Sequence, residues 1–108
     1  MRGDSPFVEL LRDWEARRVL QRQKVVRSVS LFDTDLVKVR ALAEVYGLSE
    51  QEIVASLIHH GLFELESRIP YEPGTRVIRV EEGDDIYEDI GMMPQYMEKI
   101  REITRRRQ

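Results

Sequence analysis

The chain has 108 residues, of which 42% are hydrophobic and 34% charged, and its formal net charge is -3. That length accommodates one domain with extensions, and that composition excludes a wholly disordered chain. The absence of cysteine excludes a disulfide framework, a thiolate zinc site and a thiol nucleophile, and it favours a reducing compartment. No stretch has the apolar length of a signal peptide or a membrane span, so we expect a cytoplasmic protein outside the membrane.

The N-terminal region is basic although the whole chain is acidic. Residues 1–30 contain seven Arg and Lys against four Asp and Glu. Asp4-Ser5-Pro6 is a helix start signal, and apolar residues then recur at helical spacing from Phe7 to Trp14. We therefore predict a basic amphipathic helix over 6–22 and treat residues 1–23 as an N-terminal segment.

A strand is predicted over residues 25–32. Val29 and Leu31 alternate there with Ser28 and Ser30, which is the period of a strand with one buried and one exposed face. A helix follows and ends at Gly47, a residue suited to the left-handed stop. The apolar face of this helix consists of Leu36, Val39, Leu42, Ala43 and Tyr46.

The next helix has the most specific local signal in the chain. Ser49 and Glu52 have the spacing of a capping box, and Leu48 and Ile53 stand at the two positions of a hydrophobic staple. We predict a helix over 50–66 that buries Ile53, Val54, Leu57, Ile58, Leu62 and Leu65.

Residues 67–108 are expected to form a C-terminal extension. Prolines and Gly74 mark residues 69–74 as a linker, and residues 76–80 are a strand candidate. An acidic loop over 81–85 comes next. Pro94 is expected to open a final helix that ends in Arg105-Arg106-Arg107, where cations are favoured by the helix dipole.

One strand and two short helices over 24–66 cannot cover their own apolar surface. A domain of about forty residues needs metals, disulfides or oligomerisation, and cysteine is absent. We therefore expect an intertwined homodimer in which strands 25–32 of two chains pair antiparallel, leaving the polar face of the ribbon for the DNA major groove. The expected dimer core consists of Val29, Leu31, Leu36, Val39, Leu42, Ile53, Leu57 and Ile58.

In this order and spacing, residues 25–66 resemble the ribbon-helix-helix family of the Arc and CopG type. The resemblance rests on the Ser28-Val29-Ser30-Leu31 alternation, the apolar face from Leu36 to Ala43, and Gly47-Leu48-Ser49. It implies a mainly α fold, a ribbon-helix-helix homodimer with an N-terminal helix and a C-terminal α/β extension. The family's members are obligate dimers, often assembled further on DNA, and act mostly as repressors, copy-control proteins or antitoxins.

The resemblance also implies which residues contact DNA. Ser28 and Ser30 would face the bases, and Arg22 and Lys24 would touch phosphates. Arg27 stands where the family has an apolar residue, so it faces either DNA, after a shift in register, or the core. The start of the last helix, Ser49-Glu50, corresponds to the family's phosphate contact made with backbone amides.

The leading functional hypothesis is a cytoplasmic DNA-binding transcriptional repressor. The alternative is an antitoxin or other protein-binding module that uses the same dimer and contacts a protein partner through residues 67–108. A repressor that binds an effector in this extension is a third possibility. We expect no enzyme, cofactor or metal site, because the sequence contains no phosphate loop, serine elbow or zinc motif and its two histidines are adjacent.

Overall fold

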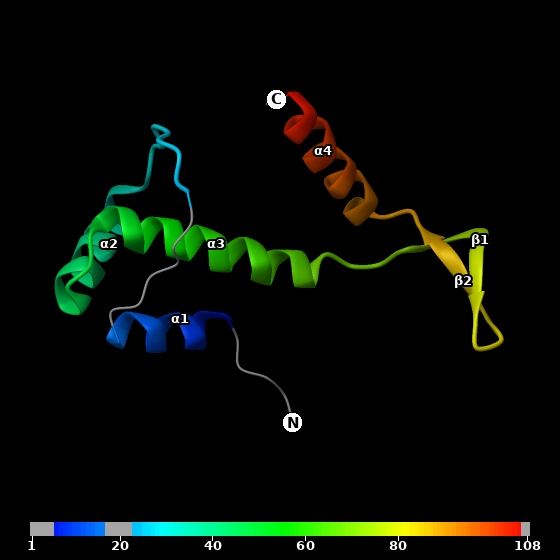
Figure 1. Ribbon diagram of the computed structural model, residues 1–108, viewed down its shortest axis with the longest axis horizontal. Helices are drawn as coiled ribbons and strands as arrows, with labels where there is room; N and C mark the ends of the chain where they lie inside the picture. Colours follow the sequence, from blue (N-terminus) through cyan, green and yellow to red (C-terminus); the bar gives the residue numbers. More distant parts are fainter. Residues whose placement is uncertain (1–5, 17–22, 107–108) are drawn as a thin grey trace. The chain divides into compact units, whose positions relative to one another are not determined.

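The computed structural model describes residues 6–16 and 23–106, and the chain divides into two compact units, 1–66 and 67–108 (Figure 1). The first unit contains three helices, although the last continues two residues beyond it. The second unit contains a β-hairpin and a helix. The elements are α1 (Pro6–Glu15), α2 (Asp33–Tyr46), α3 (Glu50–Arg68), β1 (Pro73–Glu81), β2 (Asp84–Asp89) and α4 (Met92–Arg106).

The predicted ribbon-helix-helix fold is wrong. The order helix, helix, helix, two strands, helix does not contain the strand that this fold places before its two helices. Residues 23–32 have neither strand nor helix structure, and the described strands pair only with each other, as β1 and β2. An alternating pattern forms a strand only where a neighbouring strand accepts and donates its backbone hydrogen bonds. No described segment of this chain supplies one to residues 25–32.

The turn between α2 and α3 confirms the glycine stop and the serine cap. Gly47 has φ 69°, in the left-handed region, and its amide donates a hydrogen bond to the Ala43 carbonyl, as the Leu48 amide also does at 3.0 Å. The Ser49 hydroxyl accepts a hydrogen bond from the Glu52 amide at 3.1 Å. Helices α2 and α3 are therefore joined by a short turn whose geometry both glycine and serine specify.

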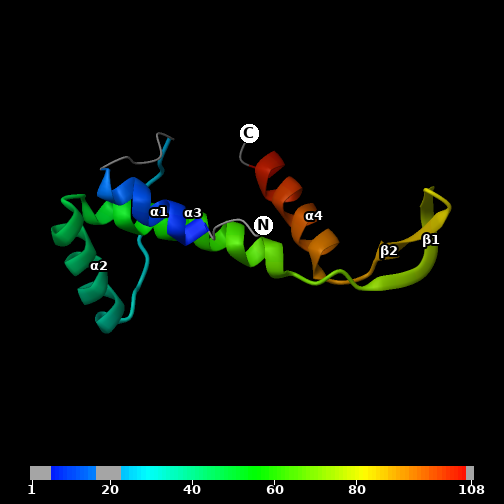
Figure 2. The ribbon, with the colours of Figure 1, turned by 90° about the horizontal axis from the view of Figure 1, so that it is seen from below.

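The core of the first unit is small and joins all three helices. It consists of Leu10 and Trp14 from α1, Val39 and Ala43 from α2, and Ile53 from α3. Helix α1 runs beside α3 (Figures 1 and 2). The centroid of its Trp14 ring lies 5.5 Å from that of the Tyr46 ring at the end of α2. Trp14 is 2% exposed and Ile53 is fully buried, so these two side chains are the centre of the unit.

The hairpin of the second unit was only partly predicted. Its first strand is longer than the 76–80 expected, and the predicted acidic loop contains the turn and the start of β2. Glu82 and Gly83 both have positive φ, 53° and 84°, which is the geometry of the two-residue turn that matches strand twist. The acidic residues of this region therefore form a hairpin end.

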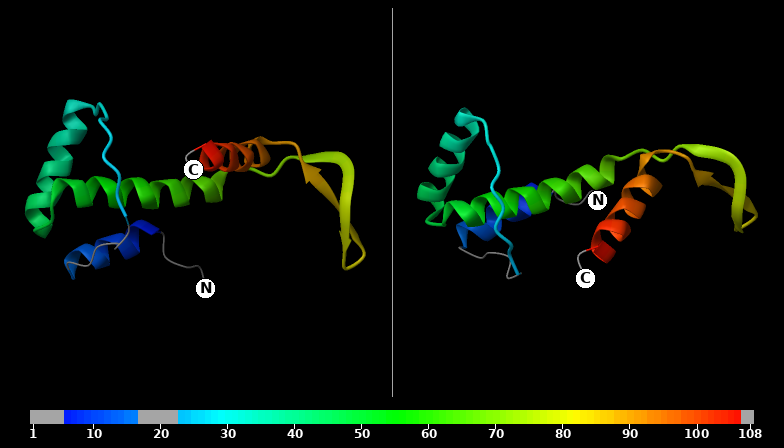
Figure 3. Two further views of the ribbon diagram at one scale, coloured as in Figure 1. Left: turned by 45° about the horizontal axis from the view of Figure 1, so that its top comes forward. Right: turned by 90° about the horizontal axis from the view of Figure 1, so that it is seen from above.

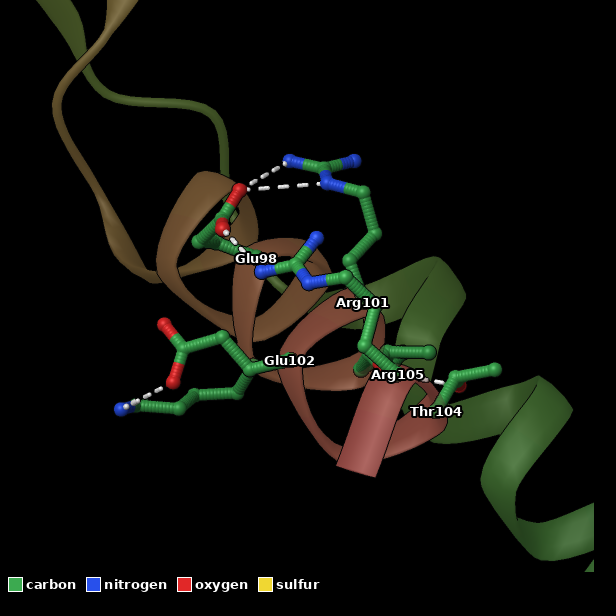
Figure 4. A network of polar contacts seen from close by, with 7 residues as sticks. Glu98, Arg101, Glu102, Thr104 and Arg105 are labelled. Atoms are coloured by element: carbon green, nitrogen blue, oxygen red, sulfur yellow. Dashed lines mark hydrogen bonds and ion pairs between the residues drawn. The ribbon is translucent and has the colours of Figure 1, made fainter. Parts of the chain in front are cut away.

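Helix α4 is amphipathic, and an ion-pair network occupies one of its polar sides. Arg101 donates two hydrogen bonds to Glu98 Oε1, at 3.1 and 2.8 Å, and Arg105 lies 3.7 Å from the other carboxylate oxygen (Figure 4). Lys99 pairs with Glu102 at 3.1 Å. None of the side chains of α4 is buried.

Replacing Arg101 with Ala should raise the pKa of Glu98 towards its ordinary value. In the intact helix that pKa is lowered, because Arg101 donates hydrogen bonds to the carboxylate and places a positive charge beside it. A lowered folded pKa means that this pair stabilises α4 above the ordinary pKa of Glu and that the contribution is lost as pH falls through the folded pKa. Carboxyl NMR titration measures the change. The matched control is Lys99→Ala, which removes a cation paired with Glu102 instead; an equal shift in both variants would contradict the assignment.

Candidate nucleic-acid interface

The extended segment, residues 23–32, precedes α2 and is exposed along its whole length. Even its apolar side chains are exposed: Val26 is 93% exposed and Val29 is 68% exposed. Ser28 and Ser30 are exposed as well, and Arg27 makes no ion pair within the described part of the chain. The side chain of Arg27 is therefore on the surface of the single chain and not in its core.

Lys24 connects the extended segment to α3. Its ammonium lies 2.8 Å from a carboxylate oxygen of Glu52, in the first turn of that helix. Both side chains are partly exposed, so the pair contributes little to stability, but it places the positive charge of Lys24 beside a negative one. A phosphate at Lys24 would compete with Glu52.

The start of α3 has a different electrostatic character from the phosphate site that the resemblance implies. Glu50 is ion-paired with Arg40 at 3.5 Å, and the Glu52 amide already donates a hydrogen bond to the Ser49 hydroxyl. A phosphate here would meet two carboxylates before it reached the amides of the helix. The contact at Ser49-Glu50 stays a prediction, and the local charge opposes it.

The expected dimer-core residues separate into two groups in the single chain. Val39 and Ile53 are buried, and Leu42 and Leu57 pack against them. Val29, Leu31, Leu36 and Ile58 are between 41% and 68% exposed. The second group therefore has no place in the core of one chain. Arg22, expected to contact phosphate, lies outside the described residues.

Two features of this region have no clear local signal in the sequence. The Lys24–Glu52 and Arg40–Glu50 pairs join residues that are distant along the chain, so no helical spacing indicates them. In a capping box the Glu52 carboxylate would accept from the Ser49 amide, whereas in the structure this carboxylate pairs with Lys24. Opposite charges on the two sequence segments are the one available hint.

The two histidines are neighbours on α3, with ring centroids 5.4 Å apart. His60 Nδ1 lies 2.9 Å from the Ser56 carbonyl oxygen, which only accepts, so this ring nitrogen carries the proton. Within residues 6–16 and 23–106, no three His, Cys, Asp or Glu side chains are placed to share a metal ion. The helices in these ranges are too short or too polar to cross a membrane.

Comparison with known proteins identifies no relative. Neither family models, nor curated proteins, nor solved structures match this chain. The ribbon-helix-helix resemblance therefore rests on the residues that suggested it, and the functional argument rests on the surface of the chain.

Proposed function

We propose that this chain is a homodimeric DNA-binding regulator, acting as a repressor, that contacts DNA through the extended segment 23–32. One observation carries the proposal: the segment is exposed throughout and presents Arg27, Ser28 and Ser30 to solvent. DNA contact also requires a compartment that contains DNA, and a cysteine-free sequence fits a reducing compartment such as the cytoplasm.

The side chains of the segment have the chemistry that DNA contact needs. The Arg27 guanidinium can bind a phosphate, or both acceptors on the edge of a guanine, with two parallel hydrogen bonds. The serine hydroxyls donate and accept, so they suit several bases. Residues 1–30, with seven basic against four acidic residues, supply a local positive charge that the net charge of -3 conceals.

The dimer is proposed from the apolar surface of the first unit. Many of its large apolar side chains are exposed, and a standard interface covers about 800 Å² on each partner. A second copy would cover this surface and double the number of DNA contacts. Among the described residues the exposed set is Phe7, Val8, Leu11, Val25, Val26, Val29, Leu31, Phe32, Leu36, Val37, Val45, Ile58, Leu62, Phe63 and Leu65.

DNA binding by the full chain should weaken steeply as salt is raised. Each neutralised phosphate contributes a slope of about -0.9 to the logarithm of the binding constant against the logarithm of salt concentration. With two copies, each contributing about one to two phosphate contacts, the slope should lie between about -2 and -4. Fluorescence anisotropy with a labelled random-sequence duplex measures it. No binding at about 50 mM salt, or binding that is independent of salt, would contradict the proposal.

A further inference from the structure

The later part of helix α4 has an apolar stripe that is exposed to solvent. Met97, Ile100 and Ile103 recur at helical spacing on one side, and helical geometry places this side away from Glu98 and Arg105. Met97, Ile100 and Ile103 are 42%, 39% and 48% exposed. Thr104 lies within the stripe, but its hydroxyl donates to the Ile100 carbonyl at 2.7 Å and is thereby satisfied. A partner can therefore cover the stripe without leaving the Thr104 hydroxyl buried and without a hydrogen bond.

The hairpin has an uncovered apolar face as well. Val77 lies opposite Tyr87 and Val80 opposite Asp85, and residues opposite each other share a face. Because Asp85 and Tyr87 are two positions apart in β2, all of these side chains point to the same side. The three apolar ones, Val77, Val80 and Tyr87, are between 38% and 62% exposed.

The junction between the hairpin and α4 is held by hydrogen bonds. One carboxylate oxygen of Asp89 accepts from the Glu72 amide at 3.1 Å and from the Gly91 amide at 2.8 Å. The Ile90 amide donates to the Glu72 carbonyl at 2.8 Å. These contacts set the direction in which α4 leaves the hairpin, and α4 runs away from the strands without lying on either face (Figures 1 and 3). The two apolar surfaces are thus separated within one chain.

The hairpin segment and the α4 segment also carry opposite net charge. Residues 67–91 contain three Arg and Lys against seven Asp and Glu, whereas residues 92–108 contain five against two. Much of the acidity is at the hairpin end, in Glu81, Glu82, Asp84 and Asp85. Arg106, near the end of α4, makes no ion pair within the described part of the chain. Helix and hairpin are therefore complementary both in apolar surface and in charge.

We propose that α4 of one copy packs across the Val77–Val80–Tyr87 face of a second copy, and that the second copy returns the same contact. A two-fold arrangement uses both surfaces of both chains, so it leaves neither uncovered. A 15-residue helix extends about 22 Å, which is within the length of about 30 Å of a nine-residue strand. This contact does not depend on DNA binding and lies outside the apolar surface of the first unit.

Cysteine cross-linking tests this contact, because the natural chain contains no cysteine. Full-length Val77→Cys and Ile100→Cys variants are co-expressed, purified and treated with a short bismaleimide, and the mixed product is identified by its mass. A link between these two variants can form only between two copies. We expect the mixed product to form in several times the yield given by Val77→Cys with Arg101→Cys, whose cysteine is about 100° around α4 from position 100.

The remaining outcomes all contradict the proposal. Equal yields for Ile100→Cys and Arg101→Cys would mean that α4 does not present its stripe to the hairpin. Predominant Ile100–Ile100 links would assign the stripe to a second α4. If no mixture gives a cross-linked product, the stripe and the hairpin face would have to contact a different protein and not a second copy. Far-UV circular dichroism of each variant confirms that the fold is retained before cross-linking.

Discussion

Replacing Ile53 with Ala should lower the free energy of unfolding of the first unit by about 2–5 kcal/mol. Ile53 is completely buried, with 0% exposure, and it is the one α3 residue in a core of five apolar side chains. So small a core has few neighbours able to move into the cavity that the substitution leaves. A large part of the stability of the unit would therefore be lost.

The single tryptophan provides the measurement. Trp14 is 2% exposed and belongs to the same core as Ile53, so its fluorescence reports unfolding of this unit in urea. Protein concentration is held constant, because association with a second copy would add to the apparent stability. Ile53→Val should cost only about 0.5–1.5 kcal/mol. Glu44→Ala, at an exposed position of α2, should change stability by less than about 0.5 kcal/mol. Equal losses in all three would refute the assigned core.

The helices of the first unit could be predicted because their signals are local. Gly47 and Ser49 specify the turn between α2 and α3 within a few residues, and the apolar period on each side does not depend on distant contacts. Pro6 likewise begins α1. Signals of this kind act through the backbone of one short segment, and for that reason they can be recognised in the sequence.

Strands depend on partners, and here the sequence was less informative. The alternation around Val29 suggested a strand, yet residues 23–32 are neither strand nor helix. The opposite error occurred at β2, where Asp84, Asp85, Glu88 and Asp89 are residues that strands usually avoid. Pairing with β1 and the turn at Glu82-Gly83 outweigh that low propensity. Pairing is a property of two segments, and neither segment alone determines it.

The candidate interface was partly predictable for the same reason. Exposure of Ser28 and Ser30 follows from a polar pattern that the sequence displays. The ion pair that brings Lys24 to Glu52 depends on how the extended segment passes α3, which is a tertiary feature. Arg27 could face either way in the sequence, and in the single chain it is exposed. The exposure of the serines was therefore predicted from the sequence, whereas the ion-pair partners of the charged side chains were not.

Changing Arg27, Ser28 and Ser30 together to Ala should weaken DNA binding by about 100-fold or more. A bidentate arginine contact contributes about 1–3 kcal/mol, and each 1.4 kcal/mol is a factor of about ten in affinity. The serine hydroxyls add smaller hydrogen-bonding contributions, and a dimer would lose every contact twice. All three side chains are exposed, so the fold should be retained, as unfolding in urea would verify.

The most direct test compares this triple variant with the natural chain on the same DNA. Duplexes are first selected by the natural protein from a random library, and affinities are then measured by fluorescence anisotropy at one fixed salt concentration. Lys38→Ala serves as the control, because it removes one positive charge from an exposed position of α2. We expect a loss of about 100-fold or more for the triple variant and only a few-fold change for the control. Equal affinity of the triple variant and the natural chain, or failure of the natural chain to select any duplex, would contradict DNA binding through the extended segment.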